Sequence, residues 1–166
     1  MRSHASHTRF AEQGVALSCP PGNYTSTADG VSSCVPCEAG TFKPFEGPGA
    51  CLSCPGDGAG DYKDTTDAAD CTACPSNAVS AEGSTSLSAC TCPAGFTGDA
   101  GSGGSCVLCE SGTYKNVRGS AACSVCPSNS LSAVGSTGLS NCSCPAGFSG
   151  DAGAGERCVA CEAGTF

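Results

Sequence analysis

Apolar residues are sparse along this chain and stand singly or in short groups, divided by stretches rich in Gly, Ser and Thr. No segment approaches the ~20 consecutive apolar residues that a membrane-spanning helix requires. The short apolar groups predict strands of about two to four residues arranged as hairpins. We expect no helix longer than a single turn.

A small motif recurs around the cysteines. A Cys is followed by Pro or Glu, a small residue and a Gly, and an aromatic residue stands four or five positions after the Cys. The Gly permits a tight turn. We expect the aromatic ring to pack on the nearest disulfide or on the next module. The aromatic residues at this position are Tyr24, Phe42, Phe96, Tyr114 and Phe148.

The chain also repeats itself at a period of 52 residues. Residues 71–114 align without gaps to residues 123–166, and 29 of the 44 positions are identical, including six cysteines. A fixed period of this length indicates tandem modules. The divisions expected are a disordered or partial N-terminal segment (1–18), two degenerate cysteine loops (19–53), repeat 1 (54–108), repeat 2 (109–160), and the start of a truncated next repeat (161–166).

Composition explains how such a chain can be ordered. Leu, Val and Phe together number 21 of 166 residues, and Ile and Trp are absent. A share below roughly 20% cannot offset the entropy lost on folding. The 17 cysteines supply the alternative, because a bridge that closes a loop of about 15 residues contributes roughly 3 kcal/mol. The cysteines are therefore expected to replace the hydrophobic core.

The disulfide scaffold and the acidic net charge limit the compartment in which the chain is found and the classes of partner that it binds. Stable disulfides indicate secretion, a cell surface or a lumen. No signal peptide is visible at the start, so we expect a fragment of a longer secreted or surface protein. The net charge of −8 gives nucleic acid or an anionic membrane no basic stripe to bind. Expected partners are other protein chains or neighbouring domains of the same protein.

The 52-residue unit resembles the cysteine-rich repeat of ephrin-type receptor ectodomains. The resemblance is carried by Cys106-Val-Leu-Cys109, the run Gly112-Thr-Tyr-Lys115, a second Cys-x₂-Cys-Pro followed by Asn129-Ser130, and Cys142-Ser-Cys144 with Gly147-Phe148. It covers roughly residues 19–166. It implies a small disulfide-rich fold of tandem EGF-like modules with short β-hairpins, almost no helix and an elongated rod shape. The ephrin-binding and kinase domains of the receptors have no counterpart here.

The resemblance also implies a crossed, EGF-like disulfide pattern, which we favour. Four bridges belong to that pattern alone: Cys54–Cys74, Cys71–Cys90, Cys109–Cys126 and Cys123–Cys142. A rival pattern joins each cysteine to its next neighbour, as Cys54–Cys71, Cys74–Cys90, Cys109–Cys123 and Cys126–Cys142. Both share Cys19–Cys34, Cys37–Cys51, Cys92–Cys106 and Cys144–Cys158, and both leave Cys161 to bond beyond the chain end. Cysteine spacing alone does not choose between them.

Other constellations are weaker. Cys51-x₂-Cys54 and Cys71-x₂-Cys74 have zinc-ribbon spacing, but such pairs also arise where consecutive disulfide loops meet, and that interpretation is favoured. A thioredoxin-like redox role lacks the scaffold it needs. An acidic loop is expected to be solvated rather than to bind calcium, and His4 and His7 are assigned to the tail. The acidic residues of that loop are Asp57, Asp61, Asp64, Asp67 and Asp70.

Two glycosylation sequons are present, Asn23-Tyr24-Thr25 and Asn141-Cys142-Ser143, and the first is the better acceptor because a bridged cysteine hinders the second. No His stands in the repeat region to activate a Ser or Cys, so we expect neither an enzyme nor a cofactor. The favoured function is a structural spacer or assembly element in a surface, matrix or filament protein. The alternatives are a receptor or adhesion segment with its own protein ligand and, more distantly, a metal-storing thiolate protein.

Overall fold

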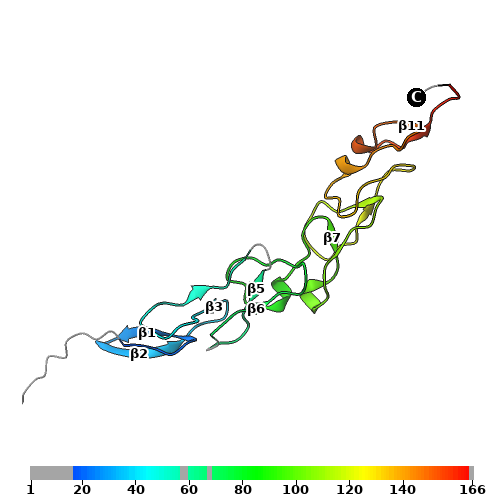
Figure 1. Cartoon of the computed structure of the whole chain (residues 1–166). Coiled ribbons are helices and arrows are strands. Elements are labelled where there is room, and N and C mark those ends of the chain that lie inside the picture. The colour runs from blue at the N-terminus through cyan, green and yellow to red at the C-terminus, as the bar shows by residue number, and fades with distance from the viewer. Residues whose placement is uncertain (1–16, 57–59, 67–68, 165–166) are drawn as a thin grey trace, which may run out of the picture.

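The computed structural model describes residues 17–56, 60–66 and 69–164. Within them the chain forms a line of small loops from β1 and β2 at one end to β11 at the other, which makes the molecule elongated (Figure 1). Residues 1–16 of the expected N-terminal segment, with His4 and His7, lie outside the described residues, as do Asp57 and Asp67 of the acidic loop. The expected rod shape is confirmed.

Eight disulfides divide the chain into eight consecutive loops. Each bridge joins a cysteine to its next neighbour, over 14 to 17 residues. They are loop 1 (Cys19–Cys34), loop 2 (Cys37–Cys51), loop 3 (Cys54–Cys71), loop 4 (Cys74–Cys90), loop 5 (Cys92–Cys106), loop 6 (Cys109–Cys123), loop 7 (Cys126–Cys142) and loop 8 (Cys144–Cys158).

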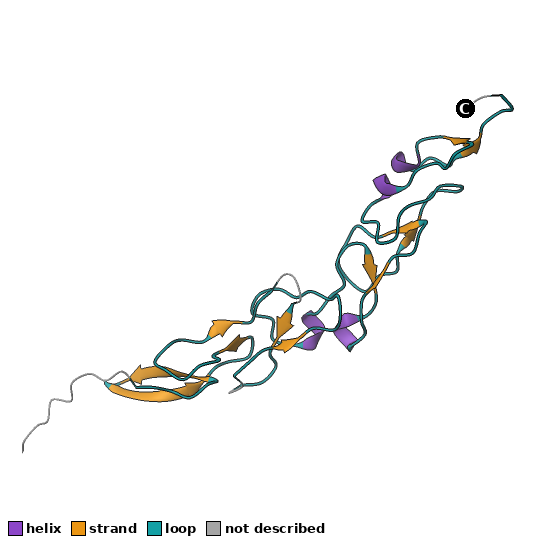
Figure 2. Ribbon diagram, in the orientation of Figure 1, coloured by secondary structure: helices purple, strands orange, loops and turns teal. Residues whose placement is uncertain are grey.

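The secondary structure of the described residues is short and local, with strands of two to six residues and three-residue 3₁₀ turns but no α-helix (Figure 2). Each strand pairs with its neighbour in an antiparallel two-stranded hairpin. The strands are β1 (Asn23–Ala28), β2 (Val31–Pro36), β3 (Thr41–Phe42), β4 (Leu52–Ser53), β5 (Asp61–Tyr62), β6 (Thr72–Ala73), β7 (Phe96–Thr97), β8 (Val107–Leu108), β9 (Thr113–Tyr114), β10 (Ser124–Val125), β11 (Phe148–Ser149) and β12 (Val159–Ala160). The 3₁₀ turns are η1 (Leu87–Ala89), η2 (Ala100–Ser102), η3 (Leu139–Asn141) and η4 (Ala152–Ala154).

The Cys-x₂-Cys spacing has a simple structural cause. In five hairpins the second strand is the residue pair between two cysteines, as in β4, β6, β8, β10 and β12. An extended strand rises about 3.3 Å per residue, which sets the flanking Cα atoms about 10 Å apart. That is beyond the ~6.8 Å reach of a disulfide. The first cysteine therefore closes its own loop and the second opens the next.

The crossed disulfide pattern is wrong, and the rival next-neighbour pattern is observed. Loop 6 shows the reason. Its hairpin pairs Thr113 with Val125, and the N–H of Cys126 donates to the carbonyl of Gly112. Cys126 has thus passed the end of the hairpin and opens loop 7. Cys123, one residue before β10, lies with its Cα 5.8 Å from that of Cys109 and closes loop 6. The modules are therefore not EGF-like in connectivity.

The interior consists mainly of cystines. Two buried clusters combine disulfide sulfurs with small residues, one around loops 4 and 5 with Ala78 and Ala100, the other around loops 7 and 8 with Ala152. Phe96 packs against the first cluster, and Tyr114 and Phe148 against the second. The expected packing of these rings on disulfides or on the next module is confirmed.

Candidate functional site

Neighbouring loops are joined by a recurring set of backbone hydrogen bonds around the motif glycine. The N–H of Cys54 donates to the Gly40 carbonyl, and the Gly40 N–H donates to the Lys63 carbonyl, both at 2.8 Å. Gly95 repeats both bonds with Cys109 and Lys115. The glycine of one loop is thus held by the opening cysteine and by the lysine of the following loop.

Two of these glycines allow a close approach between loops two apart. A Cβ at Gly40 would lie 2.3 Å from the Gly83 oxygen, and one at Gly95 would lie 2.4 Å from the Gly135 oxygen. Their φ angles are +77° and +81°, in the left-handed region that glycine tolerates best. Only glycine satisfies both demands, so contacts in the array extend to the second loop along at these points.

All three lysines of the chain are buried where consecutive loops meet, at contacts that we call joints. Lys43, Lys63 and Lys115 expose only 6%, 2% and 3% of their surface. The ammonium of Lys63 donates to the carbonyl of Thr41 at 2.6 Å, and that of Lys115 donates to Phe96 at 2.9 Å and also to Gly119. Each lysine therefore reaches back to the backbone of the preceding loop.

Lys43 makes the same kind of contact at the first joint. Its ammonium donates to the carbonyl of Cys19 in loop 1 at 3.1 Å and to that of Gly47 in its own loop at 2.6 Å. A buried ammonium is costly unless its protons are bonded. Carbonyl oxygens meet that requirement here.

Serines replace lysine at two other joints. The hydroxyl of Ser80 donates to the Asp61 carbonyl at 2.8 Å, and that of Ser132 donates to the Thr113 carbonyl at 2.9 Å. Asp61 and Thr113 open β5 and β9, just as Thr41 and Phe96 open β3 and β7. One rule therefore covers four joints: a buried side chain of one loop donates to the first strand carbonyl of the loop before it.

Burial has an electrostatic effect on Lys115. Desolvation lowers the pKa of its ammonium below the ordinary value of 10.5, since the charged form loses hydration. Two carbonyl partners oppose that cost by accepting its protons.

Burial of the lysines leaves the exterior strongly acidic. In the described ranges, Arg118 and Arg157 are the exposed cationic side chains. Exposed carboxylates are far more numerous in the same ranges. They belong to Asp29, Glu38, Glu46, Asp64, Asp70, Glu82, Asp99, Glu110, Asp151, Glu156 and Glu162. The surface is therefore more negative than the net charge of −8 implies.

The exterior also carries apolar side chains at repeated positions. The second strands of several hairpins present Leu52, Val107, Leu108, Val125 and Val159, which are 48% to 77% exposed. The Cys-x₂-Cys geometry causes this, because the buried or half-buried cysteines on either side leave the intervening pair outside.

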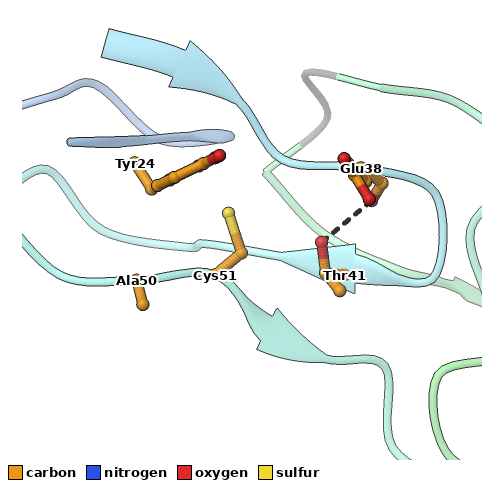
Figure 3. Close-up of a pocket in the computed structure, with 5 residues that line it drawn as sticks. All are labelled: Tyr24, Glu38, Thr41, Ala50 and Cys51. Atoms are coloured by element: carbon orange, nitrogen blue, oxygen red, sulfur yellow. Dashed lines mark hydrogen bonds between the residues drawn. The ribbon is translucent and has the colours of Figure 1, made fainter. Parts of the chain in front are cut away.

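Two grooves occupy equivalent positions four loops apart. The first, of about 290 Å³, is lined by Tyr24 from β1 and by Glu38, Thr41, Ala50 and Cys51 of loop 2 (Figure 3). The second, of about 240 Å³, is lined by the corresponding residues of loop 6 and by three residues of loop 5 and the strand after it. Its lining residues are Glu110, Thr113, Ala122, Cys123 and Cys109, with Thr97, Val107 and Leu108.

The same hydrogen bond shapes both grooves. The Thr41 hydroxyl donates to the Glu38 carbonyl at 2.9 Å, and the Thr113 hydroxyl donates to the Glu110 carbonyl at 2.7 Å. Each bond closes the turn that sets the glutamate at the groove. Both turns come from one sequence pattern, Cys-Glu-small-Gly-Thr-aromatic.

The structure places the expected site residues as follows. Sixteen cysteines are bridged, and Cys161 is a half-buried free thiol. Cys51, Cys54, Cys71 and Cys74, which have zinc-ribbon spacing, are taken up in bridges of loops 2, 3 and 4. In the described ranges no three His, Cys, Asp or Glu side chains are grouped to hold a metal ion.

The two sequon asparagines differ in their surroundings. Asn23 is half-buried at the start of β1, and its side-chain amide donates to the Pro21 carbonyl. Asn141 ends η3, and its side-chain oxygen accepts from the Gly138 N–H at 3.0 Å.

Comparison with known protein families shows to which family the chain belongs. The family model described as tyrosine-protein kinase ephrin type A/B receptor-like matches residues 25–61 and 95–142, together just over half of the chain. The chain belongs to the ephrin-receptor-like cysteine-rich repeat family. The groove at loop 6 lies wholly within the matched residues 95–142, and the groove at loop 2 lies within residues 25–61 except for Tyr24.

A curated relative gives a shorter match. Ephrin type-B receptor 3 of Xenopus laevis is 42% identical over 62 residues, which cover 37% of this chain and 6% of the receptor. The ephrin-receptor-like repeats described here thus correspond to a small part of that receptor. No helix in the described ranges has the length and apolarity to cross a membrane.

Sequence reasoning did not identify the buried lysines or the grooves. The signal for the lysines was present, since each directly follows an aromatic residue, as in Phe42-Lys43, Tyr62-Lys63 and Tyr114-Lys115. Charged residues are almost never fully buried unless paired, and each of these lysines donates to a backbone carbonyl of the preceding loop.

Proposed function

We propose that this segment is a non-enzymatic, extracellular spacer that holds other parts of a surface, matrix or filament protein at a fixed separation. The supporting observation is the linear arrangement of loops. Hydrogen bonds between loops in the described ranges join each loop to its neighbour, and the glycine contacts reach two loops along. A chain organised in this way grows in length as loops are added.

The bridges support the compartment. Eight disulfides in 166 residues persist only where the surroundings are oxidising. The interior is filled by cystines, alanines and half-buried aromatic rings. Support for a non-enzymatic role comes from this cystine-filled interior.

A deletion of one period tests the spacer. Removing residues 71–122 eliminates loops 4 and 5 and all of loop 6 except its closing Cys123. Cys123 then stands where Cys71 stood, so every remaining cysteine of the first eight loops keeps a partner. X-ray scattering should then show a shorter molecule of unchanged cross-section. A radius of gyration near the ~15 Å of a compact globule of 166 residues for the intact chain would contradict the proposal.

The second candidate is a receptor or adhesion segment with its own protein ligand. The exposed apolar side chains of the second strands and the two repeated grooves favour it, because a pure spacer needs neither. Both functions can reside in one segment, since the grooves occupy only loops 1, 2, 5 and 6 and the strand after loop 5.

A further inference from the structure

We propose that the grooves at loops 2 and 6 are paired docking sites for a basic protein partner, each accepting one arginine or lysine side chain. The proposal does not depend on the spacer function, which is tested by molecular length. It begins from the fact that the same groove is built twice. Four lining positions correspond, namely Glu38 with Glu110, Thr41 with Thr113, Ala50 with Ala122, and Cys51 with Cys123.

The size of the grooves suits a single side chain. Their volumes of about 290 and 240 Å³ lie at or below the ~300 Å³ where sites for drug-sized ligands begin. The lining is largely apolar, with Tyr24 and Ala50 in the first groove and Val107, Leu108 and Ala122 in the second. A long aliphatic stem with a polar end suits such a lining.

The charge at the grooves selects a cationic tip. Glu38 and Glu110 are exposed, and their carboxylates make no hydrogen bond or ion pair with any other described residue. The hydroxyls of Thr41 and Thr113 already donate to backbone carbonyls, so they offer lone pairs to an incoming donor. Both groups therefore present acceptors, which an arginine or lysine satisfies.

The charge of the whole surface favours a different chain over a second copy. Every lysine of this protein is buried, and the described ranges expose two arginines among many carboxylates. Two such surfaces repel each other. A basic partner is attracted at long range, and two equal sites allow it to engage twice.

The sequence marks where such a groove forms. Loops 2 and 6 open with Cys-Glu, whereas the other six loops open with Cys-Pro. Proline removes both the carboxylate and the flexible turn position. The same pattern of Cys-Glu, a small residue and Gly-Thr begins again at Cys161, one 52-residue period after Cys109.

The test is an NMR titration of the oxidised 166-residue chain with the tripeptide acetyl-Gly-Arg-Gly-amide at low salt. Amide signals of Thr41, Ala50, Thr113 and Ala122 should shift with a Kd on the order of 1 mM. The uncharged citrulline tripeptide should produce no such shifts. Equal shifts with citrulline would overturn the proposal.

The two grooves serve as controls for each other. Glu110→Gln should weaken binding at the loop 6 groove about threefold, the effect of losing an exposed ion pair, and leave the loop 2 groove unchanged. Ala122→Leu should fill the loop 6 groove and abolish its shifts. Glu156→Gln removes an equal charge outside both grooves and should change neither.

Three outcomes contradict the proposal. The first is that Glu110→Gln weakens peptide binding equally at both grooves, or no more than Glu156→Gln does. Either result would show that the peptide responds to the overall acidic surface and not to the grooves. Absence of any shift would exclude the sites. Self-association of the chain through these residues in sedimentation would assign the grooves to a second copy instead.

Discussion

The ammonium nitrogen of Lys115 lies 2.9 Å from the carbonyl oxygen of Phe96, so a side chain of loop 6 satisfies the backbone of loop 5. The same lysine accepts the Gly95 N–H at its own carbonyl. Side chain and main chain of one residue thus fasten two loops together, and removal of this residue should affect a joint before it affects either loop.

Lys115→Met should loosen the joint between loops 5 and 6. Met keeps the aliphatic stem, but the carbonyls of Phe96 and Gly119 lose their donor, which costs about 2 kcal/mol for charged hydrogen bonds. Hydrogen exchange of the Gly95 and Gly119 amides, which cross this joint, should accelerate accordingly. Arg157→Met removes an exposed cation and should stay within ~0.5 kcal/mol. Equal protection in both variants would show that the lysine contributes nothing to the joint.

Acylation of amines should leave all three lysines unmodified in the oxidised protein. The lowered pKa of Lys115 raises its share of reactive free amine, but a residue that is 3% exposed is closed to the reagent, and access decides the outcome. Mass spectrometry after treatment at pH 8 should find acylation confined to the α-amine. After reduction of the disulfides, Lys43, Lys63 and Lys115 should all react. Ready acylation of any of them before reduction would contradict their burial.

Peptide mapping should recover next-neighbour bridges. Thermolysin cleaves before exposed apolar residues, and Val125 is 77% exposed between Cys123 and Cys126. After this cut, the fragment that ends at Ser124 should separate from the one that begins with Val125 without reduction, because no next-neighbour bridge crosses the cut. A disulfide from Cys109 to the fragment that begins with Val125 would instead identify the crossed pattern.

Loss of one bridge should have a local effect. Cys144→Ser with Cys158→Ser should cost roughly 2–5 kcal/mol and expose residues 147–155 to proteases, while residues 54–106 stay protected. Phe148→Ala should cost on the order of 1 kcal/mol, because Phe148 is only half-buried and a core Phe costs ~3–5 kcal/mol. Simultaneous cleavage along the whole chain in the double serine variant would indicate one cooperative core.

Expression through a eukaryotic secretory pathway should attach a glycan to Asn23 in preference to Asn141. The Asn141 sequon contains Cys142, which is 3% exposed in its bridge to Cys126, and bridge formation competes with glycan transfer. Asn23→Gln should remove most of the mass released by an amidase specific for N-glycans, whereas Asn141→Gln should remove little. A heavier glycan on Asn141 would reverse this ranking.

The sequence was sufficient for the loops but not for their connections. Sparse apolar residues, cysteine density and the 52-residue period predicted short hairpins, bridges and a rod, because each follows from local composition. The choice between Cys109–Cys123 and Cys109–Cys126 depends on where the hairpin of loop 6 ends. Cys123 and Cys126 are only three positions apart, so their spacing does not show which of them lies beside Cys109. The favoured crossed pattern was inherited from a resemblance to EGF-like modules and was wrong.

The contacts at the joints could not be predicted from the sequence, for a different reason. Lysine belongs to the surface by its transfer free energy, and its burial here depends on carbonyls of a loop some 20 residues earlier. Likewise, Gly40 is a turn residue by its sequence, yet its contact with Gly83 arises only when three loops stack. Relations of this kind appear once neighbouring loops are placed side by side.

Next-neighbour pairing also governs how the chain can acquire its bridges during synthesis. Each bridge closes over 14 to 17 residues, so a newly emerged cysteine finds its partner in the stretch made just before it. A crossed pattern would oblige one thiol to wait, unpaired, while a later cysteine arrived. With next-neighbour pairing, each disulfide can form as soon as its second cysteine has been translocated. The time that each bridge needs is therefore independent of the number of loops in the array.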